Sequence, residues 1–193
     1  MIFRKNLRKA DKEILQDKDY IEGSDDRAII SIKAEEDEQI FSTYNYDSNE
    51  KLNAELDEFI WDKARFVPMA KDIKIKLYTN TKTDEQEVVD AIKNNYKKEY
   101  IETRNELKRN AIFSLIMLLL GLAFMSLLLL MHVYFYNVYL EIVVEIATWV
   151  FIWEAVDSFF LQRAELKRKR ITLLKLYTAE MEIIKLKKFP EEK

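Results

Sequence analysis

The stretch AIFSLIMLLLGLAFMSLLLLM, from Ala111 to Met131, decides the fold because it contains no charged residue. About 20 consecutive apolar residues are enough for a helix to cross the hydrocarbon core of a bilayer. We therefore predict a first transmembrane helix over residues 111–136. Hydrophobic residues make up 49% of the 193 residues and charged residues 34%, so the apolar side chains are pooled in the middle of the chain.

A second apolar segment, VYLEIVVEIATWVFIWEAVDSFFL, occupies residues 138–161 and contains four acidic residues but no basic one. Its length also fits a membrane span, which predicts a helical hairpin with a very short connection near Tyr136 and Asn137. The other 30 acidic residues of the chain face 31 basic residues. The formal net charge of -3 thus comes from this segment and indicates no nucleic-acid partner.

Basic residues lie at the outer ends of the two apolar segments, before the first and after the second, and not in the connection between them. Lys108 and Arg109 precede the first segment, and the connection HVYFYN contains no Lys or Arg. Cytoplasmic loops carry the excess of basic residues, so both termini are predicted to be cytoplasmic. The residues that follow the second segment are also predicted to contact anionic lipid headgroups: Arg163, Lys167, Arg168, Lys169 and Arg170.

The region before the first span predicts a small cytoplasmic domain. Residues 1–27 contain a short helix, Lys5 to Leu15, and a flexible connection, and residues 28–82 show a ββαβ pattern. Its strands are AIISIKA, QIFSTYNY and DIKIKLY, the first two joined through the acidic turn EEDE. Its helix begins near Ser48 and carries Leu52, Leu56, Ile60 and Phe66 on one face. A unit of this size needs the following helix or another protomer to complete its core.

Helices are predicted on the cytoplasmic side of both spans, over residues 83–110 and 162–188, followed by a tail at 189–193. Their apolar stripes predict that the hairpin continues as an antiparallel coiled coil. The matched pairs would be Tyr100 with Leu173, Tyr96 with Tyr177, Ile92 with Met181 and Val89 with Ile184. The alternative is that each stripe packs on the small domain. The predicted fold class is an α+β membrane protein.

Two acids of the second span are expected to face the first span. Helical spacing places Glu141 and Glu145 on one face with Thr148 and Ala155, and it places His132 on one face with Ser114 and Gly121. Small and polar faces of this kind join membrane helices. His132 lies level with Glu141 and is its predicted partner. Alternatively, these three ionisable residues lie in water at the outer interface.

The other two acids, Glu154 and Asp157, point nearly the opposite way. An isolated charge within a membrane costs about 2.5–3.5 kcal/mol on insertion scales. These residues therefore need protonation, a path to the headgroups, or a partner. The position of Glu154 favours contact with another subunit, which predicts a homo-oligomer.

The segment TWVFIWEAVDSFFLQRAELKRKR, with Trp-Glu-Ala-Val-Asp at Trp153–Asp157, resembles a group of uncharacterised prokaryotic two-span integral membrane proteins. The likeness extends over about Leu56 to Glu182. It implies a place in the prokaryotic plasma membrane, and no activity comes with it.

Residue types that enzymes need are scarce in this chain. It has two glycines, one histidine and no cysteine, so neither phosphate-binding loops nor the usual zinc or Cys-His sites can be written. We predict no enzyme activity, catalytic residue, cofactor or metal, although the acids of Ala34 to Glu38 leave a carboxylate metal site as an alternative. Two functions fit. One is a non-enzymatic membrane protein whose small cytoplasmic domain senses a ligand or binds a protein partner. The other is an oligomeric cation or proton channel, or a transport accessory, that uses the acids of the second span.

Overall fold

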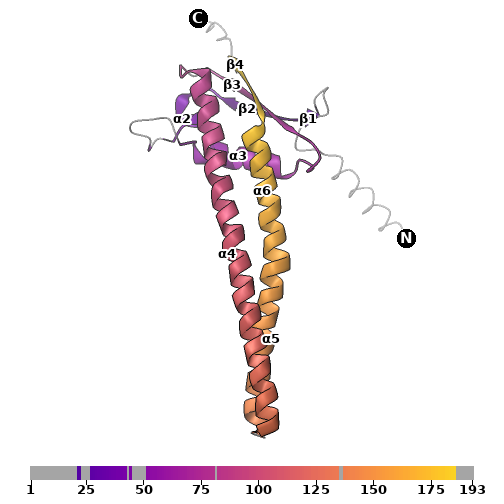
Figure 1. Cartoon of the computed structure of the whole chain (residues 1–193). Coiled ribbons are helices and arrows are strands. Elements are labelled where there is room, and N and C mark those ends of the chain that lie inside the picture. Colours follow the sequence, from indigo (N-terminus) through magenta and orange to yellow (C-terminus); the bar gives the residue numbers. More distant parts are fainter. Residues whose placement is uncertain are drawn as a thin grey trace, which may run out of the picture. The chain divides into compact units, whose positions relative to one another are not determined.

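The computed structural model describes residues 21–22, 27–42, 44, 51–80, 82–134 and 137–185. They form an α+β fold, whose helices and strands are labelled in Figure 1. The chain divides into two compact units. Unit 1 comprises residues 1–98 and 172–193, and unit 2 comprises residues 99–171. The predictions for the helix from Lys5 to Leu15, the cap at Ser48 and the tail lie outside the described residues.

A sheet with the strand order β1-β2-β3-β4 forms the centre of unit 1. Strand β2 (Ala28–Ala34) pairs in parallel with β3 (Ile73–Thr79), which pairs in parallel with β4 (Glu180–Lys185). The short β1 (Ile21–Glu22) is antiparallel to β2. Alternate residues of β2 and β3 are buried, as the period of two in their sequences predicts.

The predicted antiparallel hairpin between AIISIKA and QIFSTYNY is wrong. Its acidic turn instead begins helix α2 (Asp37–Ile40), where the side chain of Gln39 accepts a hydrogen bond from the backbone N–H of Glu35 at 2.6 Å. Acidic residues in a first turn favour the positive end of a helix. Phe41, just beyond α2, forms an isolated bridge to Leu52, and residues 43, 45 and 46 of the predicted second strand lie outside the described residues. The partner of β2 on this edge of the sheet is therefore the distant strand β3.

Helix α3 (Ala54–Arg65) connects β2 with β3 as the predicted amphipathic helix. Asn53 caps it, since the side-chain oxygen of Asn53 accepts from the N–H of Glu55 at 2.8 Å. Its core residues include Leu56 and Ile60, both buried, whereas Phe66 is exposed and contributes nothing to the predicted core face.

Helix α4 (Glu85–Tyr134) runs without a break through 50 residues, as the absence of Pro and the single Gly predict. It is long and apolar enough to cross a membrane, and only 11% of its most apolar window is buried. The core helix of a soluble protein would be mostly covered. Among the described residues no second helix passes the same test of length and composition.

After α4 come α5 (Val138–Asp157), the π-helical turn η1 (Ser158–Gln162) and α6 (Arg163–Thr178). The helix predicted over residues 162–188 is therefore too long, because Glu180–Lys185 forms β4. Met181 and Ile184 belong to that strand, so the predicted coiled-coil pairs with Ile92 and Val89 do not form. Tyr177 is exposed while Tyr96 is fully buried, so this pair is also not a matched core position.

The stripe of α4 is instead part of the core of unit 1. Val88, Ile92 and Tyr96 are buried there, as are Leu173 and Leu176 of α6. Asn95 of α4 donates a hydrogen bond to Asp57 of α3 at 3.0 Å. These observations favour the alternative in which the stripes pack on the small domain.

A ladder of opposite charges joins β4 to β3. Lys74 lies opposite Glu180, and Lys76 lies opposite Glu182, in the parallel register of β3 with β4. Lys74 Nζ is 2.8 Å from Glu180 Oε1 and 3.2 Å from Glu182 Oε2. Opposite charges on adjacent strands stabilise a pairing. The local sequence of β4 fits a helix as well as a strand, and only its distant partner β3 decides between them.

Candidate functional site

Small side chains line the contact between α4 and α5 in unit 2. Ser114, Thr148 and Ala155 are buried there. A Cβ atom added to Gly121 would lie 2.7 Å from Ile152 Cγ1, so the two backbones approach closely at this point. Phe124 stacks on Phe151 with ring centroids 5.2 Å apart. Close approach through small residues is typical of helix pairs in membranes.

The predicted pairing of His132 with Glu141 is present. His132 Nδ1 lies 3.7 Å from Glu141 Oε1, and the Glu141 side chain is 19% exposed against 71% for His132. This contact is longer than a hydrogen bond, and it carries charge on both partners only when the imidazole is protonated. Glu145 is exposed, so the prediction that it shares this contact face is wrong.

A polar cluster lies where the apolar part of α4 begins. The side-chain amide of Asn110 donates to Ser158 Oγ at 2.7 Å and to Gln162 Oε1 at 3.1 Å. Gln162 in turn donates to Asp157 Oδ2 at 3.2 Å. Of the three possibilities predicted for Asp157, namely protonation, a path to the headgroups or a partner, this bond supplies a partner, within the same chain.

The π-helical turn η1 builds this cluster. It contributes Ser158, which is completely buried, and Gln162. A π turn accommodates one additional residue relative to an α-helix, which rotates the following residues about the axis. Asn110 thereby reaches both ends of η1. Single π turns are frequent at functional sites, so this turn marks the cluster as a candidate site.

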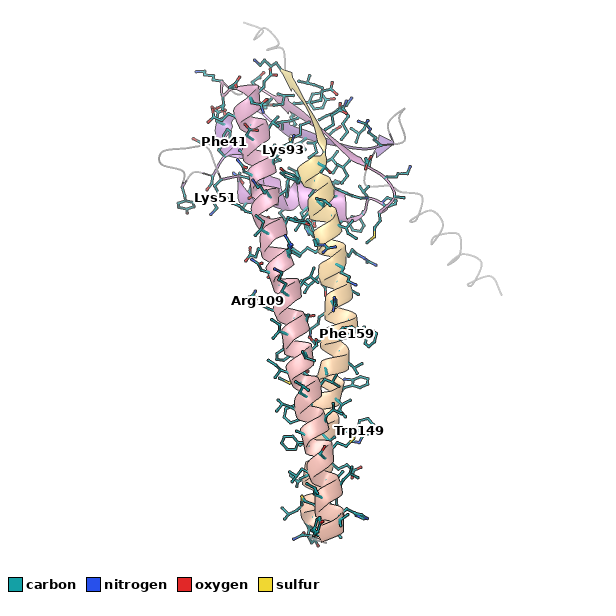
Figure 2. The ribbon with its side chains drawn as sticks, in the orientation of Figure 1. Phe41, Lys51, Lys93, Arg109, Trp149 and Phe159 are labelled. Carbon is teal, nitrogen blue, oxygen red and sulfur yellow. The ribbon has the colours of Figure 1, made fainter. Side chains whose placement is uncertain are left out.

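A groove of about 480 Å³ lies beside the cluster, between α4 and the α5–η1 segment. Leu115, Leu118, Val156 and the two phenylalanines of η1 form most of its wall, and Arg163 also lines it. The guanidinium carbon of Arg163 is 5.1 Å from the centre of the Phe159 ring. Figure 2 shows Phe159 and Trp149 on the outside of the helix pair.

Glu154 is half-buried, and its side chain makes no hydrogen bond or ion pair within the described part of the chain. Glu145 also has no side-chain partner among the described residues but is exposed, so Glu154 is the half-buried acid of the second apolar segment that lacks one. Of the basic residues predicted to contact headgroups, Arg163 and Arg170 are half-buried, and Lys167, Arg168 and Lys169 are exposed.

A second cavity, of about 560 Å³, lies in unit 1 at the carboxyl end of β2. Lys33, Glu38 and Glu55 contribute polar atoms to its wall, while Leu56 and Phe59 contribute apolar ones. Crevices at the carboxyl ends of parallel strands are common ligand sites. Among the described residues, which include Ala34 to Glu38, no group of three or more potential ligands could hold a metal ion.

Lys175 connects α6 by hydrogen bonds to the segment between α3 and β3. Its Nζ donates to the backbone oxygens of Pro68 and Lys71, each at 2.7 Å. Burial lowers the pKa of Lys175, and the negative charge of Asp72 opposes this effect. The last turns of α6 are therefore part of unit 1.

Sequence reasoning missed Asn110, Ser158 and Gln162. Each stands at the border of an apolar segment, where a polar residue is ordinary, and only the π turn brings them together. Polar residues at similar distances from the connection on both apolar segments are the one sequence signal for this cluster, and that signal does not reveal the π turn that brings them together. Comparison of the chain with protein-family models, curated proteins and solved structures gives no match in any of the three.

Proposed function

We propose that this chain is a non-enzymatic, two-span protein of a prokaryotic plasma membrane, which presents a small cytoplasmic domain for interaction or sensing. The observation that carries the proposal is the pairing of β3 with β4. These strands precede α4 and follow α6 in the chain, so they must lie on the same side of any membrane that α4 crosses. If α4 crosses once, the chain must cross back before β4.

The returning span is α5 together with η1 in this proposal. With four acids among its 20 residues, α5 is too charged to be recognised as a span from composition alone. Its other residues are mostly apolar, and most of them are exposed. The contact of His132 with Glu141 and the hydrogen bond from Gln162 to Asp157 lower the cost of burying two of these four acids in a membrane. The basic residues on both flanks support cytoplasmic termini.

The interaction or sensing role rests on unit 1. It offers the cavity at the carboxyl end of β2 and, near it in sequence, the exposed apolar side chains of Phe59, Phe66 and Met69. Its strands β3 and β4 are adjacent in the sheet, while the two proposed spans are inserted between them in the chain. A change in the membrane helices therefore has a covalent route to the sheet through both strands.

Reporter fusions test the topology. Fusions at Lys193 and at Asn137 are expected to report opposite sides of the membrane, and the chain should remain in the membrane after alkaline carbonate washing. Release by carbonate, or reporters on the same side, would overturn the proposal.

A channel or transport accessory is the second candidate. It is favoured by one observation, the half-buried Glu154 without a partner among the described residues. An oligomer that surrounds a path with this acid would explain its position in the span. The likeness of Trp153–Asp157 to two-span membrane proteins is compatible with both functions.

A further inference from the structure

We propose that the groove between α4 and the α5–η1 segment binds one anionic glycerophospholipid, whose phosphate contacts Arg163 and whose acyl chain lies along the apolar wall. The inference rests on the proposed function, because a bilayer lipid reaches this groove only if α4 and α5 cross the membrane. It adds a defined binding site to the general attraction of the basic segment for headgroups.

The lining of the groove selects an amphiphile. Leu115, Leu118, Val156 and Phe160 form an apolar wall, and Arg163 is the only charged residue that lines it within the described part of the chain. In a membrane, the acyl chains of lipids would contact this apolar wall. A ligand with one anionic end and a long apolar body therefore matches both parts of the groove.

The absence of a carboxylate partner for the Arg163 guanidinium among the described residues indicates an anionic ligand. Within the described residues its guanidinium has no carboxylate in ion-pair distance, and its one observed contact is with the Phe159 ring. The carboxylate of Asp157, six positions before Arg163 in the chain, accepts its hydrogen bond from Gln162. A half-buried guanidinium has five donors, and a phosphate accepts two of them side by side. The ring of Phe159 also holds the guanidinium at the groove.

The polar cluster fixes the shape of the site. Asn110 bonds to both ends of η1, and η1 supplies Phe159 and Phe160 to the groove. The wall is thus formed by α4 and η1, which are joined by hydrogen bonds, and not by a loop. Preorganised walls reduce the entropy lost on binding, which allows a single lipid to remain bound against exchange with the bilayer.

Native mass spectrometry of the full chain tests the proposal after reconstitution in nanodiscs of equal parts phosphatidylglycerol and phosphatidylcholine. The wild-type chain should retain one phosphatidylglycerol per protomer in clear preference to phosphatidylcholine. Arg163→Gln should lower that preference about tenfold, because it removes a direct phosphate contact. Arg170→Gln removes the same charge from the same helix without touching the groove, and it should lower the preference by roughly fivefold at most.

A second variant tests the apolar wall. Ala111→Trp fills the groove and leaves Arg163 in place, so it should abolish retention of the single lipid while the helix content measured by circular dichroism stays unchanged. Equal effects of Arg163→Gln and Arg170→Gln, or full retention in Ala111→Trp, would overturn the lipid site. So would a crosslink between two copies through a cysteine at Leu118, because a second copy would then cover the groove. These outcomes differ from failure of the proposed function, in which carbonate would release the wild-type chain.

Discussion

Lys74 on β3 and Glu180 on β4 form a hydrogen-bonded ion pair of 2.8 Å although 106 positions separate them in the sequence. Arg27 contacts the same carboxylate through its guanidinium. All of α4, α5 and α6 lies between the two strands in the chain. The pair thus joins the strand that precedes α4 to the strand that follows α6.

This pair should give the protein a specific dependence on pH. The pKa of Glu180 is lowered because Lys74 and Arg27 donate hydrogen bonds to its carboxylate. Its stabilising effect is complete above the pKa of glutamate in an unfolded chain, ~4.3, and is lost as the pH falls through the lower folded value. We expect Glu180→Gln to lower the Tm at neutral pH and to flatten the fall of Tm between about pH 5 and pH 3.

The control for this prediction is Glu58→Gln, which changes an exposed glutamate of the same unit. It should leave both the Tm and its acid dependence unchanged in scanning calorimetry. An acid dependence that is the same in Glu180→Gln and the wild type would contradict the assigned role of the pair.

Gly121 should be intolerant of even one additional carbon atom. Alanine there would place its Cβ 2.7 Å from Ile152 Cγ1 and 3.3 Å from the Ile152 backbone nitrogen. Overpacking costs about 1–3 kcal/mol, against a gain of roughly 1 kcal/mol from the higher helix propensity of alanine. We expect Gly121→Ala to lower stability in a denaturation series in detergent.

Removing the opposing side chain supplies the control. Ile152→Ala is expected to relieve part of the cost of Gly121→Ala, so the double variant should be more stable than the two single effects predict. Strict additivity would show that the two residues are not in contact.

The bonds of Asn110 should contribute measurably to the helix pair. Asn110→Ala removes two donors, to Ser158 and Gln162, each worth about 0.5–1.5 kcal/mol. Unfolding in detergent should report the loss, and Asn105→Ala, at an exposed asparagine of the same helix, should show no loss of stability. Equal stability of the two variants would mean that the polar cluster does not hold η1.

Glu154 should control assembly if it lies at a subunit contact. Glu154→Gln keeps the shape and removes the charge, so the oligomer should persist or become stronger in light scattering. Glu154→Lys should weaken it, whereas Glu145→Lys, at an exposed acid, should not. A wild-type chain that is strictly monomeric in detergent would refute the oligomer, and reduced ion flux in Glu154→Gln with an intact oligomer would favour the channel.

The sequence predicts the elements that depend on local pattern and length. The charge-free run from Ala111 to Met131 lies in α4 as expected, and the alternation of Ile73, Ile75 and Leu77 forms a strand with a buried face. The contact of His132 with Glu141 follows from the close connection of two helices of equal depth. These features need only the geometry of one helix, one strand or one pair of helices.

The errors concern segments whose structure depends on a distant partner. Glu180–Lys185 has both helical and strand periodicity, and its pairing with β3 decides the outcome. The acidic residues before Gln39 form no hairpin turn, because β1 and β3 pair with the two edges of β2 and Asp37 begins helix α2. The π turn from Ser158 to Gln162 has no local sequence signature, so the cluster around Asn110 was not foreseeable from spacing that assumes 3.6 residues per turn.

Thiol labelling in membrane vesicles tests the central claim, that β3 and β4 lie together on one side of a membrane crossed twice. The chain contains no cysteine, so single cysteines can be placed at Lys76, Glu182 and Asn137 without background. An impermeant thiol reagent added to right-side-out vesicles should label position 137 and leave positions 76 and 182 unlabelled, with the reverse result in inverted vesicles. Labelling of positions 76 and 182 from opposite sides, or of all three positions from the same side, would contradict it.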